Sequence, residues 1–134
     1  MIKPILRILF LVALTAFRPA DDNLTIFLCG DSTLADKLPT DKPETGWGMV
    51  LPDYFNTGAV QIQNHAVNGR STKSFITEGR WQKVVSQVKK GDWVFIQFGH
   101  NDQKVADSTR SSPAQTLYRQ NLIRFVNETR AKGG

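Results

Sequence analysis

Three short apolar runs divide the chain into alternating strand-like and helix-like segments. Residues 24–29 and 93–98 are near-continuous apolar runs, each followed by a glycine. This pattern is typical of parallel strands that are buried on both faces. Residues 60–64 instead alternate between apolar and polar side chains, which predicts a strand with one wet face near the edge of a sheet.

Amphipathic segments follow each of these strands. One apolar stripe has the i, i+3, i+4, i+7 spacing of a helix: Trp81, Val84, Val85 and Val88. Residues 112–132 predict a longer helix, with Ser112 as its N-terminal cap and Pro113 in its first turn. Its expected inner face carries Tyr118, Leu122, Phe125, Val126 and Thr129. Residues 47–55 are also amphipathic, but Pro52 predicts a broken or irregular helix there.

Alternation of strands and helices predicts an α/β fold with a parallel sheet and helices on both of its faces. Because the second strand resembles an edge strand, the expected strand order is 2-1-3. That order leaves the outer edge of residues 93–98 unpaired, although their apolar character is typical of an interior strand. We therefore expect a truncated domain whose C-terminal strands are missing.

Composition places the chain among ordinary globular domains, with 134 residues, 40% hydrophobic and 22% charged. The net charge of +5 is concentrated at the N-terminus, where Lys3, Arg7 and Arg18 occur without any acid. Beyond residue 20 the basic residues are interspersed with acids. Tracking of a phosphate backbone needs clustered cations, so no nucleic-acid partner is expected.

Residues 1–20 have the order of a secretory signal peptide. Lys3 and Arg7 precede a short apolar core over residues 8–16, and small residues lie at its end, Thr15-Ala16, and again at Ala20. We expect a secreted or periplasmic protein with no stable membrane association once the signal is removed; a monotopic anchor is the alternative. Residues 21–134 then form part of one domain. Cys29 is the only cysteine, which excludes intramolecular disulfides and predicts a small buried residue.

The polar residues that follow the three strands are the candidate site, because ligands of parallel sheets bind at the carboxyl ends of strands near a reversal of strand order. Gly30-Asp31-Ser32-Thr33 follows the first strand, and we expect Ser32 at a helix N-terminus, where free N–H groups can bind an oxyanion. Gly69 lies in the loop after the second strand, and Gly99-His100-Asn101-Asp102 follows the third. Taken singly, each tract could also be a cap or a turn.

Together these tracts resemble the first three sequence blocks of the SGNH (GDSL-type) hydrolase superfamily, in the same order and on the same elements. The chain further resembles the rhamnogalacturonan acetylesterase branch of this superfamily in three segments: Gly46-Trp47-Gly48, residues 64–71 and Glu78-Gly79-Arg80-Trp81. The resemblance covers roughly residues 24–104. It implies a three-layer α/β/α, flavodoxin-like sandwich, of which residues 21–134 would be the N-terminal part.

The resemblance also implies a chemistry. Ser32 would be the nucleophile, and the Ser32 N–H, the Gly69 N–H and the Asn101 side chain would form the oxyanion hole. The expected activity is carbohydrate O-acetylesterase, acting on acetylated pectic rhamnogalacturonan without a metal or an organic cofactor. The family's base is a histidine three residues after an aspartate, near the C-terminus. His65 and His100 both lack such an aspartate. These 134 residues alone are therefore expected to show little or no esterase activity.

Other residues and other functions remain open. Arg70 and His100 are candidate substrate contacts, Asp31 and Asp102 are expected to organise their own loops, and Trp47 and Trp81 are expected in the core. The alternatives are a non-catalytic carbohydrate-binding protein and an esterase for another acetylated polysaccharide such as xylan. A nucleotide-binding domain is disfavoured, because the glycine-rich phosphate motifs are absent. We expect a monomer that binds an acetylated polysaccharide or oligosaccharide.

Overall fold

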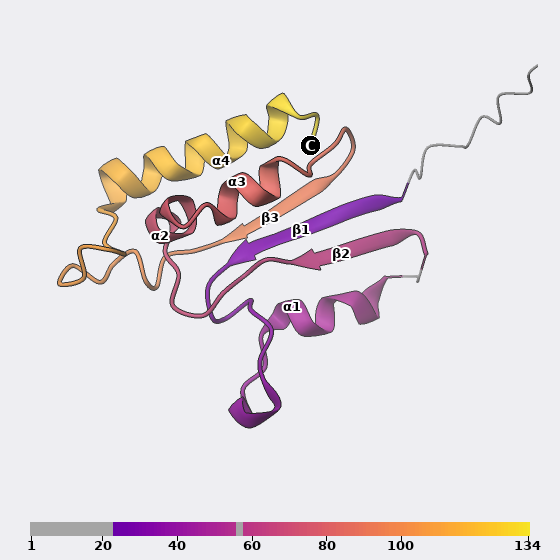
Figure 1. The fold of residues 1–134 in the computed structure, drawn as a ribbon, viewed down its shortest axis with the longest axis horizontal. Helices are drawn as coiled ribbons and strands as arrows, with labels where there is room; N and C mark the ends of the chain where they lie inside the picture. The colour runs from indigo at the N-terminus through magenta and orange to yellow at the C-terminus, as the bar shows by residue number, and fades with distance from the viewer. Residues whose placement is uncertain (1–22, 56–57) are drawn as a thin grey trace, which may run out of the picture.

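The computed structural model describes residues 23–55 and 58–134, which form a three-stranded parallel sheet flanked by helices (Figure 1). The strands are β1 (Leu24–Gly30), β2 (Val60–Asn64) and β3 (Trp93–Gln97), in the order β2-β1-β3. The predicted α/β class, strand positions and order are confirmed. The expected signal peptide over residues 1–20 lies outside the described residues.

The helices differ more from expectation than the strands do. Between β1 and β2 lie a 3-10 turn (η1, Pro39–Asp41), α1 (Trp47–Val50) and a second 3-10 turn (η2, Leu51–Tyr54). The break after Val50 confirms the irregular helix predicted from Pro52. Between β2 and β3 lie α2 (Thr72–Thr77) and α3 (Arg80–Val85), and the chain ends with η3 (Ala114–Tyr118, a π-helical turn) and α4 (Arg119–Ala131).

The main core lies between one face of the sheet and the helices α2, α3 and α4. Phe27 and Cys29 point to this face from β1, and their main apolar partners come from the three helices: Phe75, Trp81, Val84, Val85 and Phe125. Trp81 is fully buried and donates its indole N–H to Glu128 at 2.5 Å. The predicted stripe and the burial of Cys29 are thus confirmed. Burial raises the pKa of the Cys29 thiol, which leaves it protonated and unreactive.

A smaller cluster covers the opposite face. Ile26 and Leu28 alternate with the residues above, as neighbours in a strand do, and they pack against Leu34 and the partly buried Leu51 and Phe55. This cover extends over β1 and β2 but not over the start of β3, where Trp93 is 59% exposed. The two faces are therefore covered unequally.

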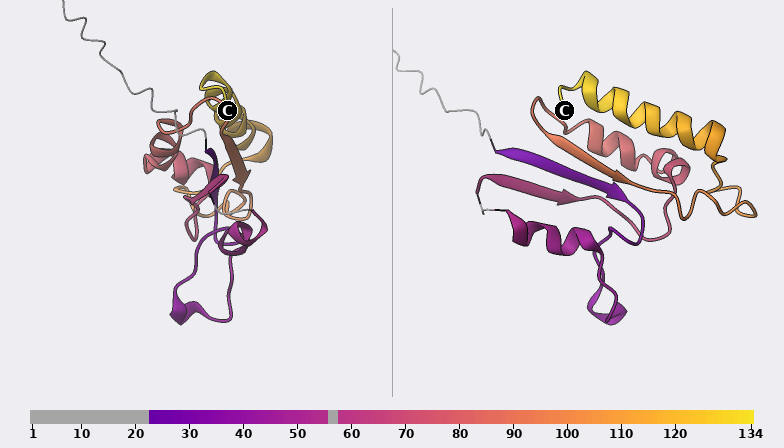
Figure 2. Two further views of the ribbon diagram at one scale, coloured as in Figure 1. Left: turned by 90° about the vertical axis from the view of Figure 1, so that its right-hand side faces the viewer. Right: turned by 180° about the vertical axis from the view of Figure 1, so that it is seen from behind.

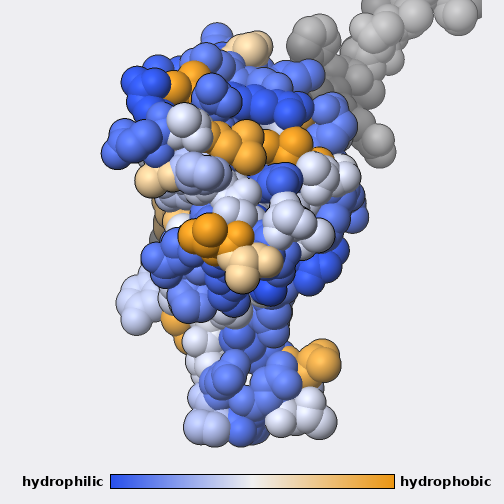
Figure 3. Space-filling model, turned by 90° about the vertical axis from the view of Figure 1, so that its left-hand side faces the viewer, coloured by the Kyte–Doolittle hydropathy of each residue, from blue (hydrophilic) through white to orange (hydrophobic). Residues whose placement is uncertain are grey.

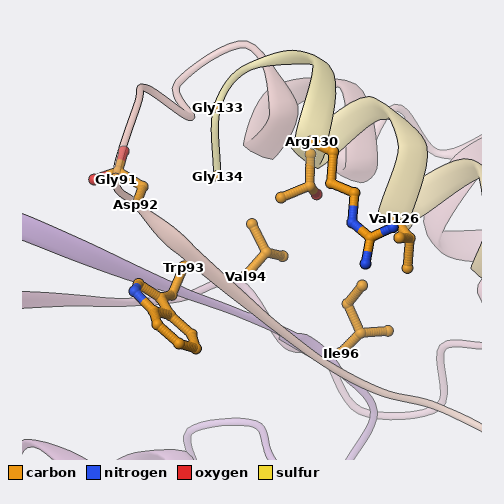
Figure 4. A pocket seen from close by; sticks show the side chains of 10 residues that line it. Gly91, Asp92, Trp93, Val94, Ile96, Val126, Arg130, Gly133 and Gly134 are labelled. Carbon is orange, nitrogen blue, oxygen red and sulfur yellow. The ribbon is translucent and has the colours of Figure 1, made fainter.

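Two expectations for the C-terminal helix are wrong. Ser112 does not cap it; its hydroxyl donates to the Arg110 carbonyl oxygen at 3.3 Å and lies beside Thr72, because the segment is drawn into a buried polar cluster. Val126 is 38% exposed rather than part of the inner face. It lines an apolar groove of about 530 Å³ between α4 and β3, together with Val94 and Ile96 (Figure 4). Among the described residues no strand pairs with the outer edge of β3.

Candidate active site

The carboxyl ends of the three strands meet at one edge of the sheet, which brings the three predicted tracts together. Leu28 is in register with Asn64, and Gly30 is in register with Gln97. All strand arrows point to the same end of the molecule, where the loops that follow them gather (Figure 1). This end has a mostly hydrophilic surface with small apolar patches (Figure 3). The segment between β1 and α1 projects from the body beside it (Figure 2).

The Ser32 loop is a tight turn, not the start of a helix. The buried Asp31 carboxylate accepts hydrogen bonds from the Thr33 N–H at 3.0 Å and the Thr33 hydroxyl at 2.9 Å. The N–H groups of Leu34 and Ala35 donate to the Asp31 carbonyl oxygen. These bonds form a single capped turn that does not continue past Ala35 into a helix, so the predicted helix N-terminus at Ser32 is wrong. The predicted role of Asp31 in the turn is confirmed. Within the described residues the partly exposed Ser32 side chain has no hydrogen-bond partner.

The glycines around Trp47 allow a second segment to pack on this turn. A Cβ atom at Gly46 would lie 1.9 Å from the Ala35 carbonyl oxygen, and one at Gly48 would lie 2.5 Å from that of Leu34. The Trp47 N–H donates to the Thr33 carbonyl oxygen at 3.0 Å. Only residues without a side chain can approach the turn this closely.

Trp47 itself is not a core residue. Its side chain is at the surface, with the residue 37% exposed, and its indole N–H donates to the Gln97 side-chain oxygen at 3.1 Å. The expectation that Trp47 lies in the core is therefore wrong, because the two flanking glycines hold its backbone against the turn and leave the ring outside. The Gln97 amide donates in turn to the Thr33 hydroxyl, next to Ser32.

Gly69 and Asn101 lie on the two loops that follow β2 and β3. Gly69 has a φ of +77°, a left-handed conformation that strains any residue with a side chain. Asn101 is 1% exposed; its Nδ2 donates to the Arg70 carbonyl oxygen at 3.0 Å, and its Oδ1 lies 3.5 Å from Arg110 Nη1. A carboxamide carries two N–H donors, so one remains for a ligand.

Asp102 joins the same two loops by a buried cluster. Its carboxylate, 4% exposed, accepts from the Thr72 N–H at 3.0 Å and from the Thr72 hydroxyl at 2.5 Å. Asn121 on α4 donates to the same hydroxyl at 2.9 Å. Burial raises the pKa of Asp102, and its hydrogen bonds from Thr72 and Ser112 oppose the rise. The predicted organising role of Asp102 extends to the start of α2, whose first residue is Thr72.

Direct hydrogen bonds therefore connect the three loops, in two cases through the last residue of the strand that precedes the loop. The Val67 N–H donates to the Gly30 carbonyl oxygen at 3.1 Å, which joins the first loop to the second. Asn101 donates to Arg70 and joins the second to the third, and the bond between Gln97 and Thr33 joins the third to the first. The structure brings the tracts that carry Ser32, Gly69 and Asn101 into one connected arrangement.

The two histidines lie in different surroundings. His65 is half-buried against the Phe27 ring, and its Nε2 lies 3.3 Å from the Gln63 side-chain oxygen. Burial lowers the pKa of His65, and the nearby positive charge of Lys83 lowers it further. His100 is exposed on the third loop. Within the described residues Ser32 has no imidazole partner, and no group of three or more His, Cys, Asp or Glu side chains could hold a metal ion. No helix in that part of the chain is long and apolar enough to span a membrane.

Sequence reasoning missed Arg110 and Gln97. Arg110 reaches Asn101 from a polar loop, where a single arginine carries no motif. Gln97 is the last residue of β3, and its contacts with Trp47 and Thr33 depend on a strand register that periodicity alone does not give. Arg70, predicted as a substrate contact, bonds to Glu78 at 3.1 Å and to the Asn68 carbonyl oxygen at 3.0 Å.

Known proteins resemble this chain in sequence and in fold. The profile of the GDSL-like lipase/acylhydrolase family matches residues 28–134. The chain is 42% identical over 110 residues to the rhamnogalacturonan acetylesterase RhgT of Bacillus subtilis. The aligned region covers 82% of this chain and 45% of that protein. It is also 41% identical over 93 residues to a rhamnogalacturonan acetylesterase of Emericella nidulans. That aligned region covers 68% of this chain and 34% of that protein.

A solved structure has the same fold. The crystal structure of the protein YxiM of Bacillus subtilis superposes with a TM-score of 0.70 at 28% identity, over 83% of this chain and 30% of that chain. In sequence the chain spans about half the length, or less, of the curated relatives that it matches, including 45% and 49% for two of the Bacillus subtilis proteins.

Proposed function

The chain belongs to the GDSL-like lipase/acylhydrolase family, and from this premise we propose that the whole protein is a carbohydrate O-acetylesterase that acts on acetylated rhamnogalacturonan. The observation that carries the proposal is the connected set of hydrogen bonds among the loops of Ser32, Gly69 and Asn101. The two relatives above 40% identity, both named rhamnogalacturonan acetylesterases, support the substrate class.

In the proposed reaction the Ser32 Oγ attacks the carbonyl carbon of an acetyl group, and its proton passes to a base. The carbonyl oxygen becomes an oxyanion that the N–H groups of Ser32 and Gly69 and the second N–H of Asn101 bind. The tetrahedral centre then expels the sugar oxygen, which takes the proton, and leaves Ser32 acetylated. Water hydrolyses this ester, releases acetate and returns the proton to Ser32.

The base is expected from a histidine that follows these residues in the complete protein. A serine hydroxyl is a weak nucleophile without such a base. His65 instead contacts the Gln63 side-chain oxygen through Nε2 and the Phe27 ring through its own ring. This leads to a direct contrast: protein expressed from the complete gene should hydrolyse an acetyl ester, whereas residues 21–134 alone should not.

Acetate release from acetylated rhamnogalacturonan oligosaccharides tests the proposal. In the complete protein, Ser32→Ala should abolish release, and Asn101→Ala should lower kcat roughly 100- to 1000-fold, the usual cost of one oxyanion donor. Ser86→Ala is the matched control, because Ser86 is exposed and its hydroxyl donates to the Lys83 carbonyl oxygen, away from the site. Full activity in Ser32→Ala would refute the assignment of the nucleophile.

Export is a second part of the proposal. The charge and apolar pattern of residues 1–20 supports a secreted or periplasmic location. N-terminal sequencing of the protein recovered from its native cells should find a start near residue 21. A start at Met1 in the cytosolic fraction would contradict export.

A further inference from the structure

The Gly69 N–H, one of the three proposed oxyanion donors, belongs to a tight turn over residues 67–70. The Arg70 N–H closes the turn by donating to the Val67 carbonyl oxygen at 3.3 Å. Gly69 occupies the third position with a φ of +77°, and the φ of Asn68 at the second position is not positive. This combination is the signature of a type II turn, in which glycine is the favoured third residue.

The orientation of its central peptide distinguishes this turn from the commoner type I. The two types differ mainly by a rotation of roughly 180° of the peptide that joins the second and third residues. Here that peptide carries the Asn68 carbonyl and the Gly69 N–H. It is trans, since the cis peptide bond of the described residues is Lys42-Pro43, and the C=O and N–H of a trans peptide point in opposite directions. A group that holds the Asn68 oxygen therefore also aims the Gly69 N–H.

The Arg70 side chain holds that oxygen. Its Nη1 donates to the Asn68 carbonyl oxygen at 3.0 Å, and its Nε binds the Glu78 carboxylate at 3.1 Å. Two contacts through different nitrogens of a planar guanidinium fix its orientation as well as its position. Within the described residues the Gly69 N–H has no hydrogen-bond partner, so it remains available on the side of the peptide away from the guanidinium. The hydrogen bond from the cation also polarises the peptide, which strengthens this N–H as a donor.

The anchor of Arg70 is a charged group that a second arginine shares. The Glu78 Oε2 accepts from the Nε of Arg70 and, at 2.5 Å, from the Nε of Arg80. Burial acts to raise the pKa of Glu78, but hydrogen bonds from Arg80 and Arg70 outweigh it and lower the pKa. The two arginine side chains are almost equally exposed, at 33% and 35%. They differ in one respect: in the part of the chain that the structure describes, the hydrogen bonds of the Arg80 side chain end at Glu78, whereas those of Arg70 continue to the turn.

The backbone of Arg70 holds a second oxyanion donor independently of its side chain. The Arg70 carbonyl oxygen accepts from the Asn101 Nδ2 at 3.0 Å, and the other N–H of that carboxamide remains for the oxyanion. Arg70 thus contacts both loops that supply donors, through its side chain toward Gly69 and through its backbone toward Asn101. A substitution of Arg70 removes the first link and retains the second.

We propose that Arg70 is a positioning residue of the esterase, whose side chain locks the Asn68–Gly69 peptide in the orientation that presents the Gly69 N–H to the oxyanion. This inference rests on the proposed esterase function for its place in the reaction. It changes the role of Arg70 from the substrate contact expected from the sequence to a support of the oxyanion hole.

Arg70→Ala in the complete protein tests the lock on para-nitrophenyl acetate, a small uncharged ester that offers an arginine no acidic group to bind. Because the oxyanion forms only during the reaction, kcat should fall about 10- to 100-fold, with little change in KM. Arg70→Lys keeps the charge but has a single nitrogen to share between Glu78 and Asn68, so its kcat should be intermediate. Arg80→Ala is the matched control and should keep the wild-type kcat.

Chemical rescue separates the lock from a general effect on folding. Gly69 and Arg70 line a cavity of about 530 Å³, which gives a small cation access to the Asn68 oxygen when the arginine side chain is removed. Guanidinium ions at millimolar concentration should therefore restore part of the kcat of Arg70→Ala and leave that of Arg80→Ala unchanged. Wild-type kcat in Arg70→Ala, or a lowered kcat that guanidinium does not raise, would overturn the inference.

NMR of the complete protein tests the turn without reference to activity. A type II turn brings the Asn68 Hα close to the Gly69 N–H, so their nuclear Overhauser effect should be strong in the wild type and in Arg80→Ala. It should weaken in Arg70→Ala as the peptide rotates. An effect of unchanged strength in Arg70→Ala would refute the lock whatever the kinetics show. If the wild type has no esterase activity, the proposed function fails, and a weakened effect in Arg70→Ala would still support the lock on the peptide.

Discussion

The Ser32 turn and the pair of loops that carry Gly69 and Asn101 are built on different physical principles. Packing without side chains holds the turn: Gly46 and Gly48 bring a second segment within contact of its carbonyl groups. A buried carboxylate holds the two loops, with Asp102 bonded to the start of α2. The first arrangement tolerates no added volume, and the second tolerates no loss of a hydrogen-bond acceptor.

This difference has a consequence for how the site responds to mutation. A clash at the turn displaces Ser32 but leaves the loops of the oxyanion donors joined, whereas loss of the carboxylate releases those loops from each other. The loss of activity relative to the loss of stability should therefore differ between mutations in the two regions. Substitutions of matched size can measure the contrast.

The largest effect on stability is expected from Asp102→Ala. It leaves the buried Thr72 N–H and hydroxyl without their acceptor, which costs about 3 kcal/mol of the free energy of unfolding. Chemical denaturation of the purified chain measures this loss. Asp53→Ala, at an exposed aspartate, should change stability by less than about 0.5 kcal/mol. A loss below 1 kcal/mol in Asp102→Ala would show that the carboxylate does not hold the loops.

Gly46→Ala should have the next largest effect, at about 1–3 kcal/mol, because the added methyl group would overlap the Ala35 carbonyl oxygen. In the complete protein we also expect Ser32 to react more slowly with a phosphonate. Expressed as a free energy, this loss of reactivity should exceed the loss of stability. Gly79→Ala provides a contrasting variant, since a Cβ atom there meets no neighbour and only its φ of +71° resists the change. Unchanged phosphonate reactivity in Gly46→Ala would remove packing as the cause of the turn's position.

A smaller effect is expected from Gln97→Ala, which removes the bonds from Gln97 to Trp47 and Thr33. These bonds are exposed, so the stability loss should be about 1 kcal/mol or less. The kcat of the complete protein should nevertheless fall, with KM little changed, because Thr33 adjoins Ser32. Gln87→Ala, whose amide bonds only to the Lys83 carbonyl oxygen, should leave kcat unchanged. Equal kcat values for the two variants would argue against a role for Gln97 in positioning Ser32.

The smallest effect concerns pH and His65. The pKa of this imidazole is lowered in the fold, so its neutral form is favoured there relative to the unfolded chain. Its contribution to stability is complete above the ordinary pKa of about 6.5 and declines as pH falls below that value. Unfolding at pH 8 and pH 5.5 should show a smaller difference in His65→Gln than in the wild type. An equal difference in His65→Gln and in the wild type would contradict a role of His65 in the pH dependence of stability.

The sequence predicts the strands of this fold better than the details of its site. Apolar runs and their alternation give β1, β2, β3 and their order, because burial on two faces leaves a direct pattern in the residues. The helix expected at Ser32 ends after one turn, because the next segment, with Gly46 and Gly48, packs against the carbonyl groups of Leu34 and Ala35. Ser112 fails as a cap because Thr72 and Asp102 recruit its segment over a long sequence separation.

The candidate site shows the same division. Its three tracts could be found from glycines and polar residues after strands, and their resemblance to a family gave them roles. Long-range partners could not be found, since Arg110 meets Asn101, and Gln97 meets Thr33, only after the chain has folded. Propensity and spacing describe near neighbours in sequence, and these contacts link loops from different strands.

The most direct test is a crystal structure of the complete protein with a phosphonate bound covalently to Ser32. A phosphonyl oxygen occupies the position of the oxyanion in the reaction. It should accept hydrogen bonds from the Ser32 N–H, the Gly69 N–H and the Asn101 Nδ2, each at about 2.7–3.1 Å. An adduct on another residue, or one whose oxygen points to solvent away from Gly69 and Asn101, would contradict the convergence of the three loops on a single reacting centre.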